Sequence, residues 1–550
     1  MKIKKITALL LSHVLIFSLV SCASSGKGSA KKDSVKELAP VIRTADKPYQ
    51  GVYYSLFVRS FADSNGDGIG DFNGIIKKLD YLNDGNDETT SDLGITGIWL
   101  LPIYPSQSYH GYDVDDYYDV NPDYGTMEDF ENLLAECKKR GISVILDMTC
   151  NHSSTYTSWF QASKNPEDPH HTWYRWITED DTRYNLKQKM WGHNVWNEDW
   201  KYKGNFYAGL FGNHMPDFNL DNPALREEFK NVMKFWMDKG VSGFRYDAAG
   251  HVYNSAKTPA GTPSTENAVK WWKEIVDYNK SVNPDTYNVG EVWENSSIRS
   301  QYVAGLGSDF HFDMGTRIEN ILKAGNDGGN TYASGLQAEY EKLALYNPDY
   351  IDAPFLSNHD QPRSAGVLKG DFETLKAAAS MYMLTEGVPF MYYGEEIAMK
   401  SGTDDPSKRT PMIWNTTVES TGLPKDKLQT TWSESRYNKK TLSVAEQSKD
   451  PSSLLNYYKR LIRLRTSHSG LYAGRFSAVS TGSGAVSSWQ MKDDIETCFV
   501  MINVSAEPVT VTIPESYADF SPIFFSHTSA VIEDGKATIP ARGTIVISDR

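Results

Sequence analysis

The chain of 550 residues exceeds one ordinary domain but can hold a large barrel with additions. Its hydrophobic content of 40% and aromatic content of 12% are enough for a folded core, which excludes global disorder. The 56 Lys and Arg against 70 Asp and Glu give a net charge of −14. An acidic surface argues against a nucleic-acid partner and suits a neutral substrate.

The N-terminus has the features of an export signal. A lysine-rich start precedes an apolar run over residues 8–20, which is too short for a membrane span. The run ends in Leu-Val-Ser-Cys at residues 19–22, which resembles the bacterial lipobox, in which the cysteine is acylated. This resemblance implies that residues 1–22 are a lipoprotein signal peptide, that Cys22 carries a lipid anchor, and that the exported protein is held at a membrane. The alternative is a soluble secreted protein whose Cys22 is incidental.

Residues 23–47 are rich in Ser, Lys, Gly and Ala, a composition that predicts a flexible tether. After the tether, residues 51–61 form the first predicted strand, and an acidic loop with interspersed glycines follows at once. Oxygen-bearing side chains at alternate positions of a tightly curved loop can wrap a hard cation, so we predict a structural calcium ion there. The predicted calcium ligands are Asp63, Asn65, Asp67, the backbone carbonyl of Ile69, and Asp71.

An EF-hand would compete with this reading of the loop. It needs an acid at the twelfth position, which here is Gly74, and it needs a helix rather than a strand before the loop. The remaining alternative is a solvated turn loop without a metal.

Strand and helix patterns then alternate along residues 48–468. The predicted strands are residues 51–61, 95–103, 141–147, 241–247, 287–291, 307–313, 353–360 and 388–395. Helical patterns separate them, among them residues 72–82, 223–239 (with Asp221 as N-cap), 266–280 and 454–465. Eight strand–helix units in this order predict an α/β fold, a (β/α)8 TIM barrel.

Two stretches depart from this alternation. Residues 153–216 are rich in Trp, Tyr, His and Asn and have little helical periodicity, which predicts an inserted subdomain after the third strand. Residues 469–550 change to Ser, Thr and Val alternation without helix signals, which predicts a C-terminal all-β sandwich domain.

Three of the predicted strands end on a carboxylate: Asp247, Glu291 and Asp360. Because barrel active sites lie at the C-terminal ends of the strands, we expect these acids to share one pocket. Arg245 lies two residues before Asp247, so both side chains should point to the same side of their strand. Three acids and an arginine suit glycosidic bond cleavage, in which one carboxylate attacks the anomeric carbon and another protonates the leaving oxygen. The alternative for any single acid is a structural helix cap.

Four segments resemble, in order, the short sequence regions of the α-amylase family, glycoside hydrolase family 13. They are Asp147–His152, Gly243–Asp247, Gly290–Trp293 and Phe355–Asp360. The resemblance covers roughly residues 48–550. It implies that Asp247 is the nucleophile, Glu291 the general acid/base and Asp360 the transition-state stabiliser of a retaining double displacement.

The same resemblance implies supporting positions. Arg245 would orient the nucleophile, Tyr112 would stack on the sugar at the cleavage site, and His152 and His359 would bind its hydroxyls. His251 and Arg409 are further implied substrate contacts. Asn151 and His251 also match two ligands of the calcium site that amylases have between barrel and insertion. The alternative for any single histidine is a satisfied core residue.

Other segments bear on the specificity within the family. Met215–Asn219 resembles the fifth family region in the form typical of a group intermediate between oligo-1,6-glucosidases and neopullulanases. Tyr109–Tyr112 reads Tyr-His-Gly-Tyr, which resembles amylases, where exo-acting α-glucosidases usually have Asp-Asn-Gly-Tyr. Ala248 after the nucleophile resembles α-1,4-acting members. Gly250 replaces the lysine that many amylases have before the histidine, and this bears on a contact with the leaving group.

Together these features imply an endo-acting, retaining hydrolase of α-1,4-glucans such as starch, glycogen or maltooligosaccharides. We expect a monomer whose only partners are the α-glucan and, through the lipid anchor, a membrane. The alternatives within enzymes are an exo-acting α-glucosidase or oligo-1,6-glucosidase, and a 4-α-glucanotransferase. The alternative outside enzymes is a surface glucan-binding lipoprotein, which would not need all three acids.

Overall fold

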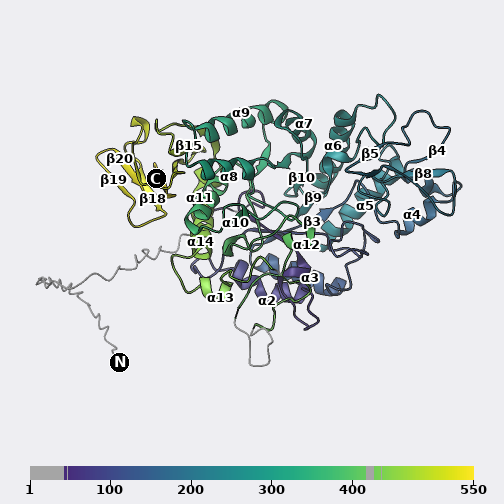
Figure 1. Ribbon diagram of the computed structural model, residues 1–550, viewed down its shortest axis with the longest axis horizontal. Helices are drawn as coiled ribbons and strands as arrows, with labels where there is room; N and C mark the ends of the chain where they lie inside the picture. Colours follow the sequence, from purple (N-terminus) through teal and green to yellow (C-terminus); the bar gives the residue numbers. More distant parts are fainter. Residues whose placement is uncertain (1–42, 46, 417–425, 435) are drawn as a thin grey trace, which may run out of the picture. The chain divides into compact units, whose positions relative to one another are not determined.

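The computed structural model describes residues 43–45, 47–416, 426–434 and 436–550 (Figure 1). The predicted signal peptide, Cys22 and nearly all of the predicted tether lie outside these described residues. Within them, no helix combines the length and the apolar character that crossing a membrane requires.

Eight parallel strands of the described chain form one sheet in the order β12-β11-β10-β9-β3-β2-β1-β13. Backbone bonds from Val388 N to Asp352 O (2.8 Å) and from Phe390 N to Pro354 O (2.9 Å) join the two ends of this order and close the ring. The strands are β1 (Tyr53–Leu56), β2 (Gly97–Leu100), β3 (Ser143–Met148), β9 (Gly243–Tyr246), β10 (Tyr287–Gly290), β11 (Ser308–Phe310), β12 (Ile351–Ala353) and β13 (Phe390–Tyr392). The predicted (β/α)8 barrel is confirmed.

The seventh strand was predicted at residues 353–360, and this prediction is wrong, because β12 ends at Ala353. Pro354 has no N–H to continue the parallel ladder, so the strand stops before it. Asp360 therefore lies in a loop, where Asn358 Oδ1 accepts hydrogen bonds from the backbone N–H groups of Asp360 (2.9 Å) and Gln361 (3.1 Å). This local turn, rather than a strand end, fixes the third acid.

Helices surround the sheet (Figure 1), and two of them have the bounds that periodicity predicts. These are α2 (Phe72–Leu82) and α5 (Pro223–Lys239). The predicted N-cap of α5 is wrong by one residue: Asn222 accepts from the N–H groups of the first turn, whereas Asp221 binds Arg175 at 2.8 Å. The other long helices are α3 (Met127–Lys139), α6 (Ser264–Val282), α7 (Ser296–Leu306), α8 (Met314–Ala324), α9 (Thr331–Tyr346), α11 (Phe372–Met383) and α14 (Leu454–Ser467).

Aromatic side chains fill the interior of the barrel. Tyr53 stacks on Phe390 at 5.1 Å between ring centroids, and Phe310 lies 4.9 Å from Phe390 and 5.3 Å from Trp99. The strands also approach closely, since a Cβ added at Gly243 would lie 1.8 Å from the carbonyl oxygen of Tyr287. The barrel is therefore a packed core, and polar groups are left for the ends of its strands.

The inserted segment between β3 and α5 has a small core of its own. It contains a three-stranded antiparallel sheet of β4 (Trp176–Thr178), β8 (Asn205–Ala208) and β7 (Trp196–Glu198), and a hairpin of β5 (Lys189–Met190) and β6 (His193–Asn194). Ile177, Val195, Trp196, Ala208 and Leu210 form its buried apolar cluster. The short helix α4 (Ser158–Ser163) precedes these strands.

The C-terminal domain is all-β, as predicted, and its first strand begins at Arg475. One antiparallel sheet has the order β14-β15-β16-β21-β18 and a second has the order β17-β20-β19. The strands are β14 (Arg475–Ala478), β15 (Val486–Lys492), β16 (Thr497–Asn503), β17 (Val509–Thr512), β18 (Ser521–Phe525), β19 (Val531–Glu533), β20 (Lys536–Ile539) and β21 (Thr544–Ser548). Side chains of both sheets share one apolar cluster, so the domain is a sandwich.

Candidate active site

Arg245 lies at the centre of the polar groups at the strand ends. Its buried guanidinium donates from Nη1 to Asp147 Oδ1 (2.7 Å) and Asp247 Oδ1 (2.8 Å), and from Nη2 to Glu291 Oε2 (2.6 Å). The ion pair with Asp247 confirms that the two side chains lie on the same side of their strand. One arginine thus fixes three carboxylates from β3, β9 and β10.

Burial raises the pKa of these carboxyl groups. The pKa rises to about 6 for Asp147 and to about 7 for both Asp247 and Glu291, although Arg245 opposes the shift. For Glu291, the neighbouring charges of Asp247 and Asp360 add to the effect of burial. Since one guanidinium faces three acids, the three carboxyl groups together retain a proton near neutral pH. General acid catalysis requires such a retained proton.

The backbone after Asp247 is strained. Ala248 has a φ of +48°, in the left-handed region that side chains rarely adopt. In this conformation its N–H donates to Glu291 Oε2 at 2.9 Å. The strain therefore contributes to fixing the second acid against the first.

Asp360 keeps its charge although it is partly buried. Against the effect of burial, His359 and Arg409 hold the pKa of Asp360 well below its usual range. The contacts are from His359 Nε2 to Oδ2 at 3.0 Å and from Arg409 Nη2 to Oδ1 at 2.9 Å. The three acids thus differ in charge: Asp360 stays ionised while Asp247 and Glu291 share a proton.

Two predicted site residues, Arg245 and His359, lie behind the acids rather than at the cavity. Arg245 is fully buried, and His359 is buried with its Nε2 2.6 Å from the hydroxyl of Tyr112 and its ring stacked on that of Tyr112 at 5.5 Å. The hydroxyl of Tyr112 also donates to Asp147 Oδ2 at 2.9 Å. Arg245 and His359 thus position the groups that face the cavity.

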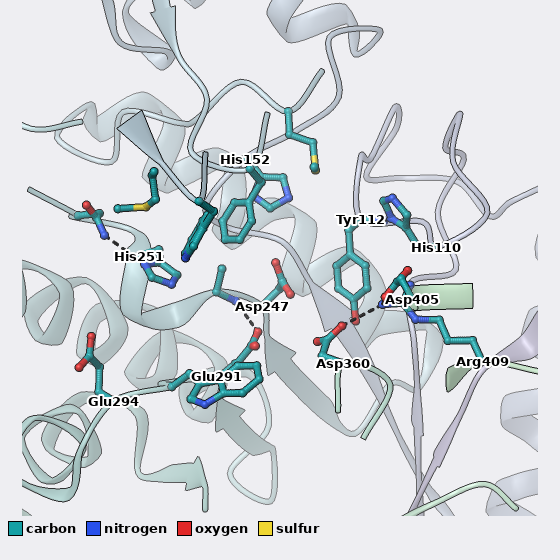
Figure 2. Close-up of a pocket in the computed structure, with 17 residues that line it drawn as sticks. His110, Tyr112, His152, Asp247, His251, Glu291, Glu294, Asp360, Asp405 and Arg409 are labelled. Atoms are coloured by element: carbon teal, nitrogen blue, oxygen red, sulfur yellow. Dashed lines mark hydrogen bonds and ion pairs between the residues drawn. The ribbon is translucent and has the colours of Figure 1, made fainter. Parts of the chain in front are cut away.

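A cavity of about 860 Å³ opens in front of the acids (Figure 2). Seven predicted site residues line it: Tyr112, His152, Asp247, His251, Glu291, Asp360 and Arg409. The sequence does not single out the other lining residues as site residues; they are His110, Met190, Trp191, Phe211, Met215, Ala248, Asn254, Trp293, Glu294 and Asp405. The structure thus brings the predicted catalytic acids and four predicted contacts into one pocket.

Two of the missed residues are exposed tryptophans. Trp191 is 59% exposed and forms the tip of the β5–β6 hairpin with a φ of +48°, and Gly192 follows it at +91°. Trp293 is 53% exposed and stacks on Phe312 at 4.7 Å. The available signals were the Trp-Gly turn in the insertion and the position of Trp293 two residues after Glu291.

His152 offers an unused polar atom to the cavity. Its Nε2 is buried without a hydrogen-bond partner, while Nδ1 lies 3.1 Å from Asn151 Nδ2. Burial lowers the pKa of His152 to about 3, and it lowers the pKa of His251 to about 4. Both rings are therefore neutral at ordinary pH and suit hydrogen bonding to uncharged hydroxyl groups.

The residues at the expected second calcium site do not fit a cation. Asn151 Oδ1 accepts from the Nζ of Lys257 at 2.6 Å, and this fully buried ammonium also lies 3.5 Å from Asp217 Oδ1. His251 instead faces the cavity, with its ring 5.4 Å from that of Trp191. A metal ion at Asn151 would have to displace Lys257, so the residues present do not fit the expected second calcium ion.

The acidic loop after β1 fits a hard cation better. Its side chains offer oxygen donors only, and no described lysine or arginine is paired with its carboxylates. Asp63 is buried and accepts from the N–H groups of Asn65, Gly66 and Gly68, and Asp71 caps α2 through Gly74 N at 2.7 Å. Asn65 and Asp67 lie beside each other, 3.1 Å apart. Calcium bound here would be held by Asp63, Asn65, Asp67, the Ile69 carbonyl and Asp71.

Comparisons with known proteins agree with this geometry. The model of the alpha amylase catalytic domain matches residues 55–474. Alpha-amylase 3 of Dictyoglomus thermophilum is 39% identical over 457 residues, which cover 82% of this chain and 84% of that protein. The 4-alpha-glucanotransferase of Thermotoga maritima is 29% identical over 465 residues, covering 83% and 96%. The crystal structure of alpha-amylase from H. orenii superposes with a TM-score of 0.81 at 36% identity, covering 91% of this chain and 99% of that one.

The fold and the acids at the strand ends define an enzyme that acts on glycosidic bonds. The chain belongs to the α-amylase family, glycoside hydrolase family 13, whose members here include an α-amylase and a glucanotransferase.

Proposed function

We propose that the chain is a retaining, endo-acting α-amylase that cleaves α-1,4-glucosidic bonds of starch, glycogen or maltooligosaccharides. The observation that carries the proposal is the group of Asp247 and Glu291 around Arg245, which faces one cavity together with Asp360. The family relatives that include an α-amylase at 39% identity support it.

In the first step, a carboxylate oxygen of Asp247 attacks the anomeric carbon while Glu291 gives its proton to the glycosidic oxygen, which leaves as a sugar hydroxyl. In the second step, ionised Glu291 takes a proton from water, and the water oxygen displaces Asp247 from the anomeric carbon. Two inversions retain the α-anomer. The raised pKa of Glu291, caused first by its burial, keeps it protonated for the first step.

The neighbouring groups have matching roles. Ionised Asp360 stabilises the positive charge that develops at the sugar ring, and Arg409 keeps it ionised. Tyr112 presents its ring to the sugar, and the free Nε2 of His152 binds a hydroxyl group. Because Arg245 reaches both Asp247 and Glu291, it sets their spacing.

The endo-acting mode is supported by lining groups on both sides of the acids. Figure 2 shows His110, Asp405 and Arg409 beyond Asp360, and His251 and Glu294 beyond Glu291. Since Glu291 protonates the leaving group, the leaving chain extends on its side and the rest of the glucan on the other.

A specific observation favours 4-α-glucanotransferase activity as a second candidate. The two exposed tryptophans, Trp191 and Trp293, line the cavity. Aromatic faces bind the apolar faces of sugars, so they could retain an acceptor sugar that competes with water in the second step. A glucanotransferase is among the relatives, at 29% identity.

Product profiling of the purified full chain tests the proposal. The substrates are soluble starch, maltotriose, isomaltose and pullulan. A fast loss of iodine staining with mixed maltooligosaccharides is the expected result. Glucose alone from short substrates would indicate an α-glucosidase, and products longer than the substrate would indicate transfer. Glucan binding without turnover of any substrate would overturn the enzymatic proposal.

We also propose that the loop of residues 63–71 binds calcium as a structural ion, because it gathers oxygen ligands whose carboxylates accept backbone N–H groups and form no ion pair with a described lysine or arginine. Adding a chelator to the purified protein should lower its melting temperature, and calcium should restore it. The variant Asp67→Asn should weaken this response, because Asp67 is on the exposed side of the loop and its removal spares the core. An unchanged melting temperature in chelator would refute the proposal.

The lipid anchor is a further proposal, supported by the sequence around Cys22. Radioactive palmitate should label the protein in bacterial cells, and Cys22→Ala should remove the label and release the protein from the membrane fraction. A soluble, unlabelled wild-type protein would show that Cys22 is incidental.

A further inference from the structure

A second buried polar cluster lies outside the active site, where β11 leads into α8. Its centre is His311, which directly follows β11 and is fully buried. Asp313 stands at the start of α8, and Glu339 is on α9. His311 and Asp313 are two residues apart in the sequence, and Glu339 is distant from both, so no sequence motif connects the three.

Ligand atoms of these three residues face one another. His311 Nε2 lies 3.2 Å from Asp313 Oδ1 and 2.9 Å from Glu339 Oε2, and all three atoms lie within 4.8 Å of one another. In tetrahedral zinc sites, ligand bonds of about 2.0–2.1 Å place neighbouring donor atoms about 3.3 Å apart. The observed separations are therefore close to those of donors around a common ion.

The buried ring nitrogen makes no in-line hydrogen bond. His311 Nε2 and Glu339 Oε2 are both buried atoms without a hydrogen-bond partner, although they are 2.9 Å apart. A buried polar atom that lacks a partner is costly. Because these two atoms face the same point, a cation bound between them would satisfy both.

The outer contacts hold these donors in the orientation that a metal needs. His311 Nδ1 donates to Asp352 Oδ2 at 2.9 Å, which leaves Nε2 as the free ligand atom. Arg317 Nη2 donates to Asp313 Oδ2 at 3.0 Å and to Glu339 Oε1, so the other oxygen of each carboxylate remains for the ion. A carboxylate behind the histidine and donors behind the ligating carboxylates are the usual second layer of a metal site.

The charges around His311 also favour a cation. Four carboxylates, those of Asp309, Asp313, Glu339 and Asp352, face the two guanidinium groups of Arg299 and Arg317. Even with a proton on His311, the four carboxylates outnumber the cations, so the cluster keeps an excess of negative charge in a mostly buried place. Asp313 is 66% exposed at its side chain, which gives an ion a way in from solvent and room for a water ligand.

We propose that His311, Asp313 and Glu339 bind a divalent transition-metal ion, best matched by zinc, at this corner of the barrel. One nitrogen and two carboxylate oxygens suit zinc better than calcium, which takes oxygen ligands only. The ion would join β11, α8 and α9. It would also brace Phe312, which lies between two of the ligands in sequence and carries the stacked ring of Trp293 at the cavity.

Equilibrium dialysis of the full chain against zinc chloride, with calcium in excess to occupy other sites, tests the proposal. Wild type should retain one zinc ion that Glu339→Gln and Asp313→Asn bind at least tenfold more weakly. Both changes keep the shape of the side chain and remove the ligand charge. Glu341→Gln, on the same helix and exposed, is the matched control and should bind zinc like wild type.

Thermal unfolding gives a second readout. Zinc should raise the melting temperature of wild type and of Glu341→Gln, but not that of Glu339→Gln. If Glu339→Gln fails to fold, the exposed Asp313→Asn variant decides. The proposal would be overturned if wild type retained no zinc, or if all four proteins retained it equally. His311 would then be an imidazolium among the acids.

Discussion

The catalytic cluster around Arg245 and the buried cluster around Arg299 are built alike but have different surroundings. In each, a buried arginine binds carboxylates on or directly after neighbouring strands: Arg245 binds Asp147 and Asp247, and Arg299 binds Asp309 and Asp352. Asp247 faces the cavity, whereas Asp309 and Asp352 are completely covered. An arginine among acids thus becomes a reactive site only where a cavity gives substrate access to one of the acids.

Replacing the nucleophile should give the largest contrast between the two clusters, because it should abolish activity and leave stability nearly unchanged. Asp247→Asn should lower kcat on starch by about 10⁴-fold or more, because the amide cannot form the glycosyl intermediate. The melting temperature should change little, since Arg245 keeps Asp147 and Glu291. Activity assays on starch measure kcat, and thermal unfolding measures the melting temperature. Turnover within tenfold of wild type would refute the assignment of Asp247.

The second acid should show a loss that depends on the leaving group. Glu291→Gln should lower kcat on starch by about 10²–10⁴-fold, because the glycosidic oxygen then leaves without a proton. With an aryl maltooligoside that releases nitrophenolate, the bond-cleavage step needs no proton and should lose much less. Pre-steady-state release of nitrophenol measures this step, with Asp247→Asn as the control that stays inactive. Equal losses on both substrates would assign another role to Glu291.

The covered cluster should affect stability rather than chemistry. Arg299→Met leaves Asp309 and Asp352 without their guanidinium and should destabilise the fold by about 3 kcal/mol. Arg183→Met, which removes an exposed guanidinium from its ion pair with Asp181, is the matched control and should leave the stability nearly unchanged. Chemical unfolding measures both, and kcat of the folded fraction should stay near wild type. A stable but inactive Arg299→Met variant would show that the cluster around Arg299 acts in catalysis rather than in stability.

The smallest expected effect is a change in pH dependence. Asp247 and Glu291 titrate together, and the active form keeps one proton, placed on Glu291. Burial raises the pKa of Glu291 to about 7, so kcat/KM on starch should fall as pH rises above that value, by about tenfold per unit. Glu291→Gln should lack this alkaline limb. An identical limb in the variant would assign the titration to a different group.

Much of the barrel could be predicted because local patterns determine it. The apolar period of α2 and α5 and the Pro at the start of α5 are signals within one helix, and they give the correct bounds. The strands β9 and β10 end beside their acids because the motif residues themselves form the strand ends. The seventh strand is shorter than its hydrophobic run predicts, because the run continues past Pro354, where pairing stops.

The site was predictable where strand ends, family motifs or sequence proximity bring its residues together. Arg245 and Asp247 are two residues apart, so alternation alone pairs them. Lys257 could not be connected with Asn151, 106 positions earlier, since only the folded chain brings the ammonium to the amide. Trp191 likewise reaches the cavity through a hairpin of the insertion, whose course depends on packing rather than on a motif.

The buried ammonium of Lys257 has a consequence for the media in which the enzyme can work. A bound ion at the junction of barrel and insertion would be in exchange with its surroundings, and phosphate, citrate or other sequestering anions would remove it. Lys257 is part of the chain and cannot be extracted. We therefore expect the insertion to keep this attachment to the barrel where free calcium is scarce.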